Sequence, residues 1–120
     1  MTTEAQRIAK ARELAEFCIR CAEEKIAQDP VLLQLPDSSS IADFFVIATA
    51  NSDPHLLALA NFIERQVREV RKLRPLSGGD FDASGGWVLL DFGDVIVHLM
   101  RPEIRAKYQL ETLWGEHKRD

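Results

Sequence analysis

Two aspartates beside a glycine turn are the residues of this sequence best suited to bind a metal ion. Asp91 and Asp94 flank Phe92-Gly93, and in a hairpin with a two-residue turn both would share one face. Two carboxylates alone make a weak Mg²⁺ site unless substrate phosphates complete the coordination shell. The simpler interpretation is that aspartates next to a glycine turn form local hydrogen bonds.

Ser52 stands before a predicted helix, and a strand with carboxylates follows later in the chain. This order of elements is faintly similar to that of a nucleotidyltransferase. That chemistry needs acidic residues that alternate on one strand, so that two metal ions are held. Here Leu89 stands two residues before Asp91, and Ile96 stands two residues after Asp94. We therefore predict no catalytic residues and no enzyme. The alternative is a nucleotidyltransferase-like enzyme that uses Mg²⁺ and a nucleotide near Ser52 and Asp91.

Cys18 and Cys21 have the spacing of a zinc or thiol redox pair. A zinc site needs four ligands, or three and a water, and the sequence has no second pair of this kind. Both cysteines lie within a helical pattern, so we predict that they are small buried packing residues. We predict neither a metal site nor a cofactor.

A basic segment runs from Arg65 to Arg74 and contains five cations and one carboxylate. Cations collect near the carboxyl end of a helix, where the helix dipole favours them. Because no aromatic residue is interleaved for base stacking, we favour this interpretation over an RNA-binding patch. We predict no sequence-specific contact with nucleic acid.

Helical periodicity and turn signals place these residues in one α/β domain, a mixed sheet of about five strands with flanking helices. The predicted elements are a helix over 4–28 with Ile26 on its apolar stripe, strands over 31–35 and 43–49, a helix after Pro54 with Val70 on its stripe, a glycine-rich loop over 76–86 with one short strand, a hairpin over 87–100, and short helices up to Gly115. The strand over 43–49 is apolar on both faces, which is typical of the middle of a covered sheet.

The predicted hairpin has one aliphatic face and one unusual face. Val88 and Leu90 share the aliphatic face with Val95, Val97 and Leu99, which must be core. The opposite face mixes carboxylates with large apolar side chains: Trp87, Leu89, Asp91, Asp94, Ile96, His98 and Met100. Either a terminal helix covers this face, or it binds a partner. For Trp114, near the end of the chain, we favour an anchor that docks the tail onto the sheet.

Length and composition fit one small globular domain over residues 1–120, with a flexible tail from about residue 116. The chain has 46% hydrophobic residues, a formal charge of −4 and a pI near 5.4, which exclude an intrinsically disordered chain and a general nucleic-acid binder. No apolar run is long enough to cross a membrane, and no signal peptide is visible. These features predict a cytoplasmic protein.

Three blocks in order resemble the ribosomal silencing factor family, also called Iojap-like. They are Asp-Phe-Phe-Val-Ile-Ala-Thr-Ala-Asn-Ser over 43–52, Gly-Trp-Val-Leu-Leu-Asp-Phe-Gly-Asp-Val-Ile-Val-His over 86–98, and Tyr-Gln-Leu-Glu-Thr-Leu-Trp-Gly over 108–115. The resemblance covers about residues 5–116. The stretch 77–84 departs from it, because it lacks the Glu-Gly that the family often shows ahead of its Trp.

The resemblance implies a nucleotidyltransferase-like fold without catalytic carboxylates. It also implies binding to the large ribosomal subunit through its ribosomal protein fourteen, which blocks joining of the small subunit and represses translation when nutrients are short. Carried over to matching positions, the contact residues would be Trp87, Asp91, His98, Met100, Tyr108 and Trp114. With Leu89 and Asp94 from the same hairpin face, they form the predicted partner-binding set. That apolar face would also suit a homodimer that competes with the ribosome.

Overall fold

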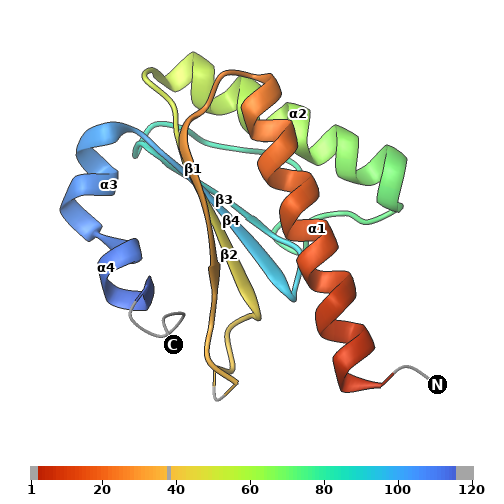
Figure 1. Cartoon of the computed structure of the whole chain (residues 1–120). Helices are drawn as coiled ribbons and strands as arrows, with labels where there is room; N and C mark the ends of the chain where they lie inside the picture. The colour runs from red at the N-terminus through yellow and green to blue at the C-terminus, as the bar shows by residue number, and fades with distance from the viewer. Residues whose placement is uncertain (1–2, 38, 116–120) are drawn as a thin grey trace.

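A four-stranded mixed sheet, with helices on both sides, organises the part of the chain that the structure describes, residues 3–37 and 39–115 of a computed structural model (Figure 1). The elements are α1 Glu4–Glu24, β1 Gln28–Gln34, β2 Phe44–Thr49, α2 Asp53–Arg71, β3 Trp87–Asp91, β4 Val95–Met100, α3 Pro102–Tyr108 and α4 Leu110–Gly115. The predicted α/β class, with a mixed sheet and flanking helices, is confirmed.

The strand order is β1-β2-β4-β3, with β2 and β4 parallel and the two outer pairs antiparallel. Every residue of β2 and β4 is buried. This agrees with the prediction that the strand over 43–49 lies in the middle of the sheet, since side chains on both of its faces are covered. In the described residues the sheet has four strands, not about five, because the segment 76–86 forms none.

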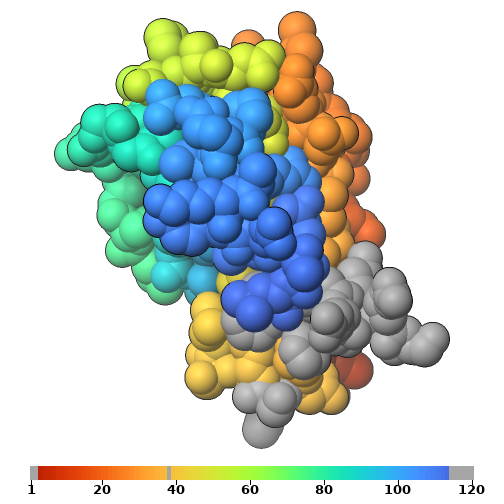
Figure 2. All heavy atoms as spheres, turned by 90° about the vertical axis from the view of Figure 1, so that its left-hand side faces the viewer, coloured from red at the N-terminus to blue at the C-terminus, as the bar shows by residue number. Residues whose placement is uncertain are grey.

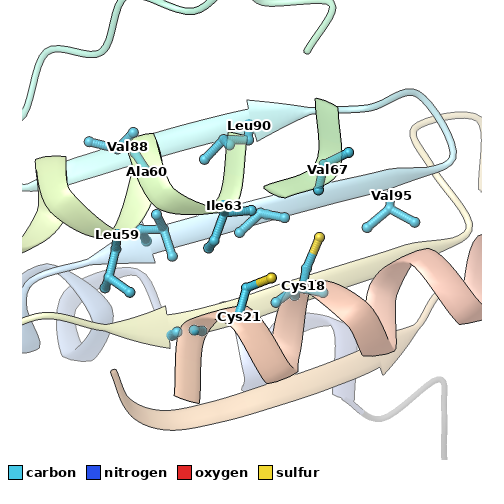
Figure 3. Close-up of a cluster of buried hydrophobic side chains, with 14 of the residues drawn as sticks. Cys18, Cys21, Leu59, Ala60, Ile63, Val67, Val88, Leu90 and Val95 are labelled. Carbon is cyan, nitrogen blue, oxygen red and sulfur yellow. The ribbon is translucent and has the colours of Figure 1, made fainter. Parts of the chain in front are cut away.

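The larger core lies between the sheet and the helix pair α1 and α2 (Figure 3). Cys18 and Cys21 point into it from α1, and Ile63 and Val67 point into it from α2. Cys18 is 0% exposed and Cys21 5%. Both cysteines are free and buried, as the sequence predicts. Burial raises the pKa of the Cys21 thiol to about 11, which disfavours the reactive thiolate.

α1 ends earlier than its apolar stripe predicts, and the last stripe residue of α2 lies within the helix but outside the core. α1 ends at Glu24, not near Gln28, because Gln28 already pairs with Thr49 in the sheet. The predicted stripe residue Ile26 has a φ of 60° and is 79% exposed. Val70, at the end of the α2 stripe, is 56% exposed. Strand pairing therefore overrides helical periodicity at the end of α1.

α2 begins as predicted, directly after the end of β2. The Ser52 side chain accepts a hydrogen bond from the backbone N–H of His55, and Pro54 occupies the first turn. Among the described residues, no helix is long and apolar enough to cross a bilayer.

Candidate partner-binding surface

The hairpin of β3 and β4 has the two faces that the sequence predicts, but its register differs by two residues from that of a Phe92-Gly93 turn, because Asp91 lies opposite Ile96 and not opposite Asp94. Val88 lies opposite Leu99 and Leu90 opposite Val97, and all four side chains are buried in the core beneath α1 and α2. The aliphatic face therefore points inward. The other face carries Trp87 opposite Met100, Leu89 opposite His98, and Asp91 opposite Ile96.

The C-terminal helices α3 and α4 cover much of this second face (Figure 2). Ile104 of α3 and Leu110 of α4 pack against a second apolar cluster that includes Met100 and Ile96. Met100 is 0% exposed and His98 5%. Both side chains are buried within the chain itself, so, contrary to the expectation from the sequence, this structure presents neither of them directly to a partner.

Besides the two aspartates of the turn, three large apolar or aromatic side chains of the predicted set remain accessible around the edge of this cover. Leu89 is 39% exposed and Tyr108 is 48% exposed, whereas Trp87 is half-buried. The Trp87 and Tyr108 rings lie 4.9 Å apart between centroids. We call Trp87, Leu89 and Tyr108 the docking surface. It combines the edge strand β3 with the end of α3.

Beneath the docking surface, His98 links the edge strand to the buried cluster. Trp87 Nε1 donates a hydrogen bond of 3.2 Å to His98 Nδ1, and the His98 ring meets the edge of Phe45 at 4.5 Å between centroids. His98 Nε2 is buried and has no hydrogen-bond partner among the described residues. Burial lowers the pKa of His98 to about 4, so the imidazole is neutral at pH 7.

The two aspartates of the turn do not act together. Asp91 Oδ1 accepts a hydrogen bond of 2.8 Å from the backbone N–H of Gly93, as expected of a local turn. Asp94 instead forms an ion pair of 3.0 Å with Arg7 of α1. Arg7 also pairs with Asp43, so the guanidinium ties α1 to the start of both parallel strands. The Asp94 carboxylate points toward α1 while its side chain stays 51% exposed, so its contact with a partner stays a prediction.

Ser52 and Asp91 lie at opposite ends of the sheet. Thr49, three residues before Ser52, is paired with Met100, and Met100 is paired with Trp87 at the start of β3. Asp91 is at the other end of β3, about 13 Å from Trp87 if each residue of the strand rises about 3.3 Å. The alternative of a shared nucleotide site near both residues is therefore not supported. In the described part of the chain, no three His, Cys, Asp or Glu side chains group as a metal ion requires.

The basic segment is largely engaged within the helices. Arg68 pairs with Glu64 one turn earlier, and Arg71 pairs with Glu13 of α1. The Arg71 guanidinium also lies over the Phe17 ring, 5.2 Å from its centroid. These contacts favour a structural role for the segment.

Arg105 of α3 is a residue that the sequence reasoning did not select. Its side chain is 11% exposed and pairs with Glu111 of α4 at 2.6 Å, while its Nη1 donates to Thr49 Oγ1 at 2.8 Å. A polar cavity of about 410 Å³ lies alongside and is lined in part by Gln28 and Gln109. An arginine in a charged tail carries no signal that it will be buried. The predicted anchor Trp114 lies in α4, but its side chain, like the predicted tail 116–120, is outside the described residues.

Comparison with known proteins places these features in one family. A family model described as "Ribosomal silencing factor during starvation" matches residues 8–120. Ribosomal silencing factor RsfS of Halalkalibacterium halodurans is 35% identical over 88% of this chain and 88% of its own. The mouse protein named mitochondrial assembly of ribosomal large subunit protein 1 is 30% identical over 82% of this chain, which spans 44% of that protein.

A solved structure agrees in fold. The crystal structure of a Chromobacterium violaceum protein matches with a TM-score of 0.77 and 31% identity, and the match covers 87% of this chain and 85% of the other. The family match extends over nearly the whole chain and therefore includes both central strands, the β3–β4 hairpin and the C-terminal helices. The chain belongs to the ribosomal silencing factor family.

Proposed function

We propose that this chain binds the large ribosomal subunit through its ribosomal protein fourteen, prevents association with the small subunit, and represses translation under nutrient limitation. Family membership supports a silencing role on the ribosome. The large subunit is named in the mouse relative. The observation that carries the proposal is an accessible apolar surface on the edge strand, built from Trp87, Leu89 and Tyr108.

Large aromatic side chains that are partly buried and partly accessible are suited to anchor a protein interface. Trp87 fits this description because its indole packs on Tyr108 while the residue stays half-buried. The docking surface has charges of both signs near it. The carboxylate of Asp91 is on the last residue of β3, and the Lys107 ammonium lies 5.4 Å from the centroid of the Tyr108 ring. The acidic segment 80–94 adjoins this surface and would steer encounter with a basic ribosomal protein.

Silencing of this kind needs no reaction, so in this proposal the protein is not an enzyme and uses no cofactor. A protein bound on the subunit-joining face excludes the small subunit by occupying its space. Such a block works only while the site is occupied, so a slowly dissociating contact is required. We propose that the chain acts in the cytoplasm, where bacterial-type subunits join.

The test is co-sedimentation of the purified chain with purified large subunits, followed by addition of small subunits. We expect the wild-type chain to sediment with large subunits and to lower the fraction of joined ribosomes in a sucrose gradient. Trp87→Ala should bind at least about tenfold more weakly, because truncation of an interface tryptophan removes most of its packing area. Leu89→Ser should weaken binding in the same direction.

The matched control is Val70→Ala, an exposed apolar residue on α2, on the opposite side of the sheet. It should bind like the wild type. Circular dichroism and thermal unfolding establish that each variant is folded. Absence of co-sedimentation by the wild-type chain overturns the proposed function. Unchanged binding of folded Trp87→Ala and Leu89→Ser overturns the docking surface. Light scattering of the free chain reports whether it forms a homodimer, and loss of that dimer in Trp87→Ala would assign it to the same surface.

A further inference from the structure

The buried histidine of β4 presents a chemical puzzle. His98 sits among apolar neighbours, is 5% exposed, and leaves Nε2 buried without a hydrogen-bond partner among the described residues. A buried polar atom without a partner costs free energy, and an aliphatic residue would avoid that cost. A reason for a histidine at this position must therefore come from its other ring nitrogen, Nδ1.

That other nitrogen fixes both the tautomer of His98 and the orientation of Trp87. An indole N–H is a donor only, so Nδ1, which receives it at 3.2 Å, is the acceptor, and the imidazole proton is on Nε2. Phe45 holds the His98 ring from the sheet side with its edge contact at 4.5 Å. The acceptor is thus held rigidly on a central strand, where every residue is buried.

The Trp87 side chain is restrained by fewer contacts than the His98 ring. It is the first residue of the edge strand β3, is half-buried, and lies diagonally across the strand pair from His98. One ring neighbour, Tyr108, belongs to the short helix α3 and is itself 48% exposed. A large side chain at such a site can occupy several rotamers, and ordering it on binding would weaken the complex.

We infer that His98 is a positioning residue that holds the Trp87 indole in the orientation that the partner of the docking surface recognises. The role rests on the proposed function, since it concerns the affinity of the same surface. His98 acts only through Trp87, because its own side chain is 5% exposed, lies between Phe45 and Trp87, and does not reach the surface. The interaction orders the indole before binding, so that less entropy is lost in the complex.

The test uses two replacements of His98 in the full chain. His98→Leu removes the acceptor but keeps an apolar side chain of similar size, and it should bind large subunits about three- to tenfold more weakly. His98→Asn places an amide oxygen near the position of Nδ1 and should restore binding to within about twofold. A general packing defect would instead be rescued by leucine and not by asparagine.

A spectroscopic readout follows the indole directly. In ¹⁵N-labelled protein, the Trp87 indole N–H resonance is assigned as the one missing from Trp87→Phe. It should shift and exchange faster with solvent in His98→Leu, and not in His98→Asn. In the Trp87→Phe background, His98→Leu should change binding no further, because the two residues act as one unit.

The outcomes separate the two proposals. If the wild-type chain does not bind large subunits, the proposed function fails, and this role fails with it. If Trp87→Ala loses binding while folded His98→Leu binds like the wild type, the docking surface stands and the positioning role is overturned. Additive effects of Trp87→Phe and His98→Leu also overturn it.

Discussion

Arg105 and Thr49 form a hydrogen bond that joins the C-terminal helices to the end of a central strand. Arg105 Nη1 donates to Thr49 Oγ1 at 2.8 Å, while the remaining edge of the guanidinium binds both oxygens of Glu111. One nearly buried side chain thus holds α3, α4 and β2 in register. This matters for the docking surface because Tyr108 is the last residue of α3.

Removal of this guanidinium should loosen the helical cover. In Arg105→Met, Glu111 and Thr49 lose their partner, and we expect the free energy of unfolding to fall by roughly 1–3 kcal/mol. Hydrogen exchange of backbone amides in α3 and α4 should accelerate more than in β2. Lys107→Met is the control, since Lys107 is exposed on the same helix. Equal stability of the two variants would contradict a role for Arg105 in holding the helices.

Gly86 precedes Trp87 in a conformation that favours glycine. Its φ is +76°, and an added Cβ would lie 2.7 Å from Arg101 Nε and 2.9 Å from Ile104 Cγ1. We expect Gly86→Ala to cost roughly 1–2 kcal/mol of stability from the backbone conformation alone. Gly79→Ala, in the same segment, meets nothing within 4 Å and should stay within about 0.5 kcal/mol of wild type. Chemical denaturation measures both, and equal values for the two variants would argue against strain at Gly86.

The buried histidine makes stability depend on pH in a defined window. Burial lowers the pKa of His98 from 6.5 to about 4, so between these values the unfolded chain binds a proton that the folded chain does not. This contribution to stability is fully present above pH 6.5 and is lost as the pH falls toward 4. The loss should approach roughly 1.4 kcal/mol per pH unit inside the window.

The measurement compares urea unfolding of the wild-type chain and His98→Asn from pH 7.5 down to about 5. Carboxylates titrate in both proteins, so the difference between the two curves isolates His98. The wild type should lose stability faster than the variant as the pH falls. Parallel curves would show that the imidazole titrates normally in the folded protein.

Thiol chemistry tests the core between α1 and the sheet. Burial raises the pKa of both Cys18 and Cys21, and the pair is almost without solvent exposure. We expect a thiol-specific disulfide reagent at pH 8 to label the folded chain slowly, at a rate limited by opening of the core. In guanidinium chloride both thiols should react at once. Rapid labelling of one thiol in the folded chain would contradict this packing.

The two faces of the hairpin and the central position of β2 could be predicted because the hydrophobic pattern of each segment is compatible with only one arrangement in the sheet. An aliphatic row formed by Val88, Leu90 and Leu99 can only point inward, and a slip by one residue would turn it to solvent. The start of α2 near Ser52 and Pro54 followed from local rules for helix starts. The end of α1 did not follow, since pairing of Gln28 in the sheet overrode helical periodicity there.

The accessibility of the second hairpin face could not be read from the sequence. His98 and Met100 look like contact residues when only the hairpin is considered, but the structure buries both, and the cluster that contains Met100 is packed against Ile104 and Leu110 of the helices that follow. Which face a short helix covers depends on tertiary contacts such as the hydrogen bond between Arg105 and Thr49. The residues that neighbour Arg105 in the sequence do not indicate that its side chain forms this hydrogen bond.

The parallel pairing of β2 and β4 also sets an order of folding. α2 and the segment 72–86 lie between these two strands in the sequence, so the pairing closes a long loop before any of its contacts form. β1 and β2 are neighbours in the chain and can pair first. Until β4 arrives, β2 presents an open edge that is apolar on both faces, which is the kind of edge that associates with other chains. We therefore expect the chain to be prone to associate with other chains during synthesis until β4 is inserted beside β2.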